Sequence, residues 1–199
     1  MIFYNEHNNI INIDVIEKPE QDLAKKYILP NDTVLELGAR YGTVSCVINS
    51  KLFNKLNQVS VEPDDRVWDA LEKNMLNNNC YFNIVKGFIS KIKINLFHKD
   101  RDYGTTYFLD ENTNINCYSM EYIKKTYNIK HFSVLVADCE GGLELFLYEN
   151  PELYTDLRLI IFEADYPNKC NYDLIRHNLK INKFIELEKG HQNVWIKNN

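Results

Sequence analysis

The stretch VLELGARYGTVS, residues 34–45, decides the fold because it joins an apolar run to a glycine turn and then to a helical pattern. The run at 33–37 predicts a buried strand, and the pattern after Gly42 predicts a helix over residues 42–56. A dinucleotide-binding turn needs the order G-x-G-x-x-G, which lets backbone approach a pyrophosphate. Arg40 blocks that approach, so the turn favours a cofactor without phosphates, unless it is only a tight strand-to-helix connection.

Outside this stretch, short apolar runs alternate with helical patterns along the chain. Strands are predicted at residues 33–37, 58–62, 81–89, 91–98, 132–138 and 157–165, with two more, antiparallel to each other, within 183–198. Helices are predicted at residues 17–28, 42–56, 64–79, 119–128, 142–154 and 171–182, and Pro151 breaks or restarts the helix over 142–154. This alternation predicts an α/β fold with a mostly parallel, Rossmann-like sheet, right-handed crossovers, helices on both faces and an antiparallel end.

Length and composition bound the organisation of the chain. Its 199 residues, 45% of them hydrophobic, predict a single domain, with residues 1–30 as a helical N-terminal extension of a core over residues 31–199. Five cysteines with no C-x-x-C pair predict neither a disulfide framework nor a zinc site. No signal-peptide pattern or membrane-length apolar run is present, so we expect a soluble, cytoplasmic protein without a membrane partner.

The charge balance bears on the partners of the chain. The formal net charge is -5, which argues against a general binder of the nucleic-acid backbone. Lys86, Lys91, Lys93 and Lys99 form either a local basic patch or the solvated face of a strand. Nucleic acid is therefore not the expected partner, and the sequence leaves the oligomeric state open.

Several of the predicted strands end in an acid. The acids at these positions are Glu36, Glu62, Asp138 and Glu163. Because ligands of parallel sheets gather at the carboxyl ends of the strands, these acids predict one polar crevice. Glu36 is placed to order the glycine turn or to accept a hydrogen bond from a ligand ammonium. Glu62 stands where such folds bind ribose hydroxyls; the alternative is an acid at the start of the next helix.

Five motifs, taken together, resemble a known family. VLELGARYGTVS, VSVEPDD, GFIS, VLVADCEGGLE and LIIFEAD have the order and spacing of class I S-adenosylmethionine-dependent methyltransferases, and are most similar to the FkbM-like branch. That branch has a G-A-N-x-G loop, matched by residues 38–42; an E-P pair, matched by Glu62 and Pro63; and D-x-E-G-x-E, matched by residues 138–144. Arg40 replaces the usual asparagine, and the last motif is longer by one residue.

The resemblance implies a seven-stranded sheet with an antiparallel last strand, S-adenosylmethionine as cofactor, and O-methylation of a sugar or glycoconjugate. It implies that GFIS cradles the adenine, with Phe88 stacked on the base or buried in the flank of the sheet. The cofactor site then comprises Glu36, Gly38, Ala39, Arg40, Tyr41, Gly42, Glu62, Pro63, Gly87, Phe88 and Asp138.

A hydroxyl acceptor must also lose its proton, either to a general base or through a metal ion. We expect Asp138 to be the catalytic residue, assisted by Glu140 or Glu163, whereas Asp165 is expected to cap a helix. Neighbouring carboxylates of this kind could also bind Mg²⁺, although the sequence does not require a metal. The segment 98–119 is the most loop-like part of the chain, and we expect it to shape the acceptor pocket.

Two further functions compete with O-methylation of a small acceptor. One is methylation of a nucleic acid or a protein, which the acidic balance disfavours. The other is a catalytically degenerate fold that binds a cofactor or a partner without turnover. Arg40 and the additional residue in the DCEGGLE segment are the features that support this second reading.

Overall fold

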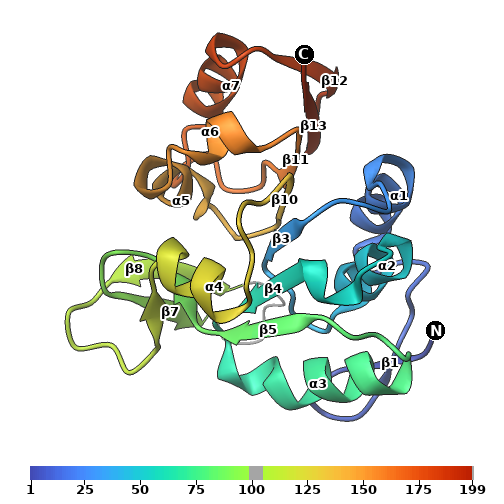
Figure 1. Ribbon diagram of the computed structural model, residues 1–199. Helices are drawn as coiled ribbons and strands as arrows, with labels where there is room; N and C mark the ends of the chain where they lie inside the picture. The colour runs from blue at the N-terminus through green and yellow to red at the C-terminus, as the bar shows by residue number, and fades with distance from the viewer. Residues whose placement is uncertain (99–104, 199) are drawn as a thin grey trace.

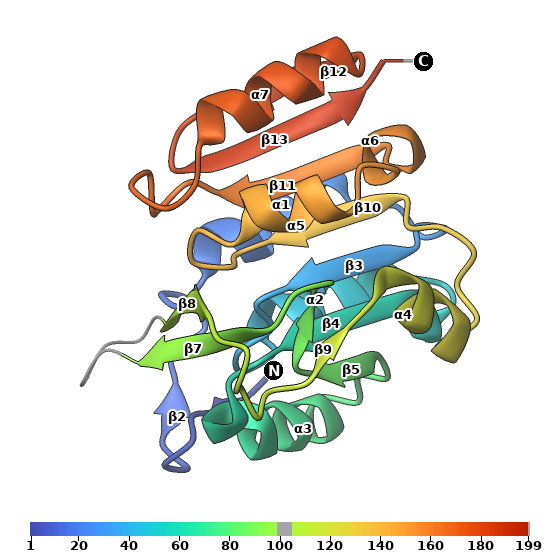
Figure 2. The same cartoon turned by 90° about the vertical axis from the view of Figure 1, so that its left-hand side faces the viewer.

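The structure is a computed structural model that describes residues 1–98 and 105–198. Its centre is a seven-stranded sheet in the order β12-β13-β11-β10-β3-β4-β5 (Figures 1 and 2). The strands are β3 (Val34–Leu37), β4 (Gln58–Glu62), β5 (Asn83–Lys86), β10 (Val134–Ala137), β11 (Leu159–Glu163), β12 (Phe184–Glu188) and β13 (Gln192–Lys197). Neighbouring strands pair in parallel except where β13, inserted between β11 and β12, pairs antiparallel with both. The predicted mostly parallel sheet with an antiparallel last strand is confirmed.

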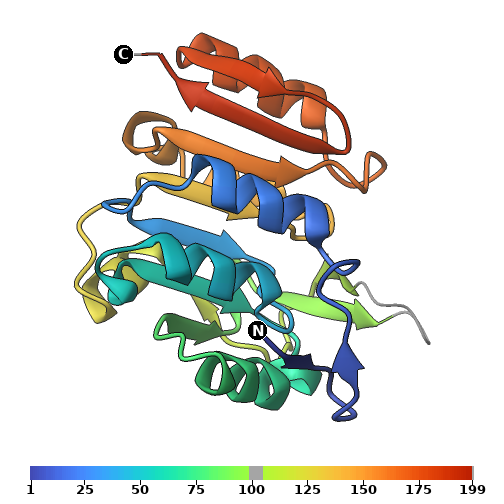
Figure 3. The ribbon, with the colours of Figure 1, turned by 90° about the vertical axis from the view of Figure 1, so that its right-hand side faces the viewer.

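Helices cover both faces of the sheet. On one face lie α1 (Lys18–Tyr27), α2 (Thr43–Lys51) and α3 (Trp68–Asn77), as Figure 3 shows. On the other lie α4 (Met120–Thr126), α5 (Leu143–Glu149), α6 (Leu153–Asp156) and α7 (Tyr172–Ile181), as Figure 2 shows. Successive residues of a strand point to opposite faces, so Val34 packs with α1 and α2 whereas Leu35 packs with α5 and α7.

Smaller strand pairs surround the sheet. At the N-terminus β1 (Phe3–Tyr4) pairs with β2 (Ile10–Ile11), so residues 1–30 contain a short hairpin in addition to α1. The other pairs are β6 (Phe88–Ile89) with β9 (Cys117–Tyr118), and β7 (Ile94–His98) with β8 (Thr105–Leu109). Figure 2 shows β7 and β8 at the end of the sheet towards which the parallel strands point. Strands β6, β7 and β8 therefore form a wall beside the carboxyl ends of the parallel strands of the central sheet.

Three sequence-based boundaries are wrong. The helix predicted over 42–56 ends at Lys51, because a short 3-10 helix (Lys55–Asn57), capped by the side chain of Asn54, follows it. The strand predicted over 81–89 is two strands, because the chain turns at Gly87, where φ is 143°. The segment 98–119 contains β8 and β9 instead of being irregular throughout, and its residues 99–104 lie outside the described part.

Candidate functional site

The turn after β3 brings two strand ends into direct contact. Gly38 has a φ of 86°, and a Cβ atom on it would lie 1.7 Å from the carbonyl oxygen of Asp138. No side chain fits in that space, so the close approach that Gly38 permits is to the backbone at the end of β10. Gly42 follows at a φ of 77° as the N-cap of α2. Arg40, between them, also has a left-handed backbone, with a φ of 41°.

The buried Glu36 side chain stabilises this turn through hydrogen bonds to its neighbours. Its side chain is 2% exposed, and Oε2 accepts hydrogen bonds from Ser45 Oγ of α2 at 2.6 Å and from Ser60 Oγ of β4 at 2.5 Å. Its other oxygen, Oε1, is buried and has no hydrogen-bond donor among the described residues. Burial raises the pKa of Glu36 to about 7. Glu36 therefore ties β3, α2 and β4 together and lies in a small cavity behind the turn.

Glu62 joins two loops at the end of β4. Oε2 accepts from the Arg40 backbone N–H at 2.6 Å, and Oε1 accepts from the Asp64 N–H at 2.8 Å. The Trp68 indole donates to the Glu62 carbonyl oxygen at 2.8 Å. Burial raises the pKa of the Glu62 carboxyl to about 7. Asp64, and not Glu62, caps the following 3-10 helix (Asp65–Val67), so Glu62 is not the capping acid of that helix.

A cleft that is open to solvent lies at the carboxyl ends of β3, β4 and β10. The sequence-predicted residues that line it are Gly38, Arg40, Glu62, Pro63, Phe88, Asp138 and Glu140. The remaining wall is largely apolar and comes from β6, β7, β8 and α5. Among the described residues that line the cleft, Arg40 is the only cation, and its guanidinium stacks 4.9 Å from the centre of the Tyr41 ring.

The other predicted cofactor residues lie around the cleft. Ala39 and Gly42 belong to the turn, and Gly87 turns the chain between β5 and β6, where a Cβ would meet the Asn116 carbonyl oxygen at 2.3 Å. Tyr41 is buried, and its hydroxyl donates to Glu6 Oε2 at 2.5 Å. Tyr41 therefore fastens the N-terminal segment to the turn instead of lining the cleft.

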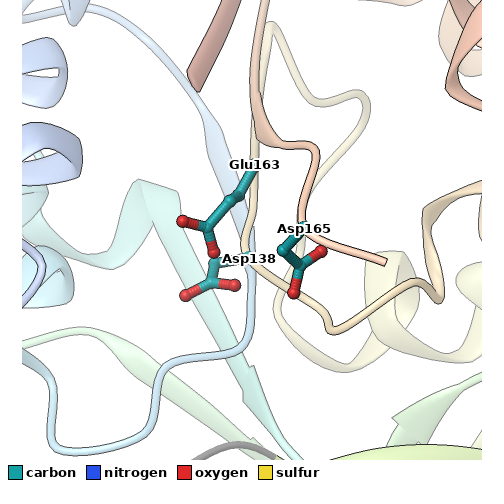
Figure 4. Close-up of side chains that lie close together, drawn as sticks. All are labelled: Asp138, Glu163 and Asp165. Atoms are coloured by element: carbon teal, nitrogen blue, oxygen red, sulfur yellow. The ribbon is translucent and has the colours of Figure 1, made fainter. Parts of the chain in front are cut away.

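Carboxylates from two neighbouring strand ends meet beside the cleft (Figure 4). Ligand-capable oxygens of Asp138, Glu163 and Asp165 all lie within 4.8 Å of one another. Asp138 follows β10, whereas Glu163 ends β11 and Asp165 follows it. Asp165 accepts a hydrogen bond from Tyr172 Oη at 2.9 Å, while Asn171 caps α7; the predicted capping role of Asp165 is therefore wrong.

Burial and neighbouring acids raise the pKa of two carboxyls at this site. Burial and then the neighbouring Glu163 carboxylate raise the pKa of Asp138 well above its usual range. Burial and then Asp165 raise the pKa of Glu140 to about 7. Asp138 Oδ1 is buried without a hydrogen-bond donor among the described residues, whereas Glu163 Oε1 lies 2.5 Å from His191 Nε2. Asp138 is thus the member of the cluster that offers an unused acceptor at the cleft.

Sequence reasoning missed residues that tertiary packing brings to the cleft. Glu17, at the start of α1, lines both the cleft and the cavity behind it and accepts a hydrogen bond from Thr43 Oγ1. Glu149 of α5 is a further wall residue that no motif marks, whereas Tyr107 of β8 belongs to the segment 98–119 that was expected to shape a pocket. Glu17 stands well before the glycine turn in a polar stretch, and no motif marks it.

The buried carboxyls predict an unusual dependence of stability on pH. Glu36 and Glu62 bind protons more tightly in the folded chain than at their ordinary pKa of 4.5. Their contribution to stability is therefore complete below pH 4.5 and is lost as the pH rises through about 7. We expect the free energy of unfolding to fall between pH 5.5 and 8.5, by an amount on the order of 2 kcal/mol per group. Urea unfolding at several pH values measures it.

The Glu36→Gln variant is the control for this effect. Glutamine retains an acceptor for Ser45 and Ser60 but does not ionise. Its stability should depend less on pH than that of the wild type, and it should be the more stable protein at pH 8.5. A variant with the same pH slope as the wild type, or a wild type whose stability rises from pH 5.5 to 8.5, would contradict the assignment.

Comparisons with known proteins show which solved structures have a similar fold. No protein-family model matches the chain, and no curated protein matches its sequence. Among solved structures, it is similar to a ribosomal protein L11 methylase from Lactobacillus delbrueckii subsp. bulgaricus, at 16% identity and a TM-score of 0.51, covering 92% of this chain and 79% of that one. It is also similar to an O-methyltransferase from Bacillus cereus in complex with SAH, at 13% identity and a TM-score of 0.52, covering 90% and 80%.

A putative RNA methyltransferase from Pyrococcus horikoshii is similar to the same extent, at 14% identity and a TM-score of 0.52, covering 90% of this chain and 80% of that one. At such identities the likeness concerns the fold. Within the described residues, no helix combines the length and the apolar character needed to cross a membrane. The chain therefore has the α/β fold of class I methyltransferases, with a cleft at the carboxyl ends of its central strands.

Proposed function

We propose that the chain is an S-adenosylmethionine-dependent methyltransferase that acts on a hydroxyl of a small acceptor, and that it belongs to the FkbM-like branch, with a sugar or glycoconjugate as acceptor. The observation that carries the proposal is the meeting of Gly38, Glu62, Phe88 and Asp138 in one cleft at the carboxyl ends of β3, β4 and β10. Methyltransferase structures with the same fold support it.

The residues of the cleft fit this cofactor by charge. S-adenosylmethionine supplies a methyl group on a positively charged sulfur, and it carries an ammonium, a carboxylate and two ribose hydroxyls. Glu62 and the buried Oδ1 of Asp138 offer acceptors for its donor groups, and Arg40 offers a cation for its carboxylate. Phe88 offers an aromatic face for the adenine.

The carboxylate cluster suits removal of a proton from a hydroxyl. Burial raises the pKa of Asp138, and a carboxylate with a raised pKa is a stronger base towards a hydroxyl proton. In this proposal Asp138 takes the hydroxyl proton, and Glu140 or Glu163 assists. The alternative is that Asp138, Glu163 and Asp165, whose oxygens lie within 4.8 Å of one another, hold Mg²⁺ that binds the hydroxyl.

The walls of the cleft disfavour an anionic acceptor. Nucleic acid needs cations for its phosphates, and Arg40 is the only cation among the described residues that line the cleft. Two of the lysines of the predicted basic patch have intramolecular partners: Lys86 pairs with Glu72 at 2.8 Å, and Lys91 Nζ donates to the Glu149 carbonyl oxygen. RNA and proteins remain the second candidate class, because similar folds include enzymes described as methylating them.

Calorimetric titration with S-adenosylmethionine and S-adenosylhomocysteine tests the proposal. The wild type should bind both, and Glu62→Gln should weaken the affinity about 10- to 100-fold, because one hydrogen bond between a carboxylate and a ligand donor is lost. Glu72→Gln is the matched control, since Glu72 lies on α3 and pairs with Lys86 outside the cleft. Its affinity should equal that of the wild type.

Absence of binding at millimolar concentrations of both ligands would remove the methyltransferase proposal. Equal losses in Glu62→Gln and Glu72→Gln would contradict the position of the cofactor in the cleft. The unfolding midpoints of both variants are measured alongside, because Glu62 also accepts two backbone hydrogen bonds.

A further inference from the structure

A second hollow lies beside the cleft, next to Tyr107 of β8. It is an open groove between α5, α6 and α7. Its lining residues are Tyr107, Glu144, Leu145, Leu147, Tyr148, Pro151, Tyr154, Leu174, Ile175 and Asn178. We call this hollow the α5–α7 groove.

The α5–α7 groove is apolar but faces water. Tyr148 is 83% exposed and Leu174 is 43% exposed, although both are large apolar side chains. Leucine, isoleucine, proline and three tyrosines make up most of its lining. Exposed apolar surface gathered in one concavity is typical of a binding site.

The charges of the groove limit what it can bind. No lysine, arginine or histidine is among its described lining residues, so it offers no partner for a phosphate. Its one carboxylate, Glu144, already accepts a hydrogen bond from the Asn171 backbone N–H at 2.7 Å. The groove therefore suits an uncharged, apolar ligand.

The α5–α7 groove adjoins the cleft. Tyr107 and Leu145 line both hollows, Tyr107 from β8 and Leu145 from α5. Tyr107 also lies against the turn before α5, where a Cβ on Gly142 would be 3.8 Å from its ring. A molecule that occupies the cleft at Asp138 therefore has to extend only past Tyr107 and Leu145 to reach the groove.

We propose that the α5–α7 groove binds an apolar extension of the acceptor, an alkyl or aromatic group attached to the hydroxylated part that is methylated. This inference rests on the proposed function for the place of the hydroxylated part. It deepens that function, because it makes the acceptor an amphipathic molecule and not a free sugar. The proposal rests on the apolar lining of the groove and on Tyr107 and Leu145, which line both the groove and the cleft.

A series of alkyl glucosides tests the proposal by binding alone. Methyl, hexyl and octyl β-glucoside are titrated calorimetrically into the full chain, below their micellar concentrations and with S-adenosylhomocysteine present. Each methylene that leaves water should strengthen binding, so octyl glucoside should bind roughly 10- to 100-fold more tightly than methyl glucoside. Leu174→Glu, which puts a carboxylate into the groove at an exposed site, should abolish this gain.

The matched control is Leu76→Glu on α3, where Leu76 is 63% exposed and lines neither hollow. In this variant the affinity should still rise with alkyl chain length as it does in the wild type. Octyl glucoside that binds no more tightly than methyl glucoside, or a gain that survives in Leu174→Glu, overturns the proposal. Titration with S-adenosylhomocysteine alone tests the proposed methyltransferase function separately. If that ligand does not bind but affinity still rises with alkyl chain length and depends on Leu174, the proposed function fails while binding of an apolar group in the groove is supported.

Discussion

Replacing Gly38 by alanine should destabilise the fold more than any other single substitution in the cleft. The new Cβ would lie 1.7 Å from the Asp138 carbonyl oxygen, and the φ of 86° disfavours any side chain. The clash is with backbone at the centre of a parallel sheet, so β3 and β10 would have to separate. We expect a loss of more than about 4 kcal/mol, equivalent to roughly 10 °C or more in Tm, measured by thermal and urea unfolding.

Gly190→Ala is the control for this prediction. Gly190 lies between β12 and β13, and the nearest atom to a Cβ there is the Gln192 carbonyl oxygen at 3.9 Å. This variant should unfold within about 1 kcal/mol of the wild type, as surface substitutions usually do. A Gly38→Ala protein as stable as Gly190→Ala would contradict the contact between the two strand ends.

Asp138→Asn should reduce turnover about 10²- to 10⁴-fold, the usual contribution of a general base. Asparagine keeps the size of the side chain but cannot take a proton, so the affinity for S-adenosylmethionine should change only a few-fold. Formation of S-adenosylhomocysteine in the presence of an alkyl glucoside measures turnover, and calorimetry measures affinity. Asp173→Asn on α7, whose side chain is 93% exposed, is the control and should retain activity.

The same assay separates the two ways of activating the hydroxyl. If Asp138 is a base, a chelator leaves turnover unchanged, and Asp165→Asn has a smaller effect than Asp138→Asn. If the cluster holds Mg²⁺, a chelator abolishes turnover and added Mg²⁺ restores it. Turnover of Asp138→Asn equal to that of the wild type would exclude both roles for Asp138.

The fold could be predicted from the sequence because its central strands are nearly all apolar. Residues 34–37, 134–137 and 159–163 are covered on both faces, so each reads as a continuous apolar run between helical patterns. The end of α2 could not be predicted in this way. Phe53 and Leu56 continue an apolar spacing but are exposed, and local capping by Asn54 ends the pattern instead.

The candidate site could be predicted in part for a topological reason. Parallel strands end at the same edge of the sheet, so acids that follow them, such as Glu62 and Asp138, gather in one place. Glu17 could not be predicted, because it precedes α1, whose position depends on tertiary packing and leaves no pattern in the chain. Tyr107 belongs to the segment 98–119, which was expected to shape a pocket, although the spacing did not single out this residue. Glu36 was expected to order the glycine turn or to bind a ligand ammonium, but its hydrogen bond from Ser45 could not be predicted from spacing.

A crystal structure of the chain grown with saturating S-adenosylhomocysteine tests the central claim most directly. Density for the ligand should occupy the cleft lined by Gly38, Glu62 and Phe88, with its ribose at Glu62 and its adenine at Phe88. Density for the ligand at another surface, or a cleft that stays empty of it at saturating concentration, would contradict the account.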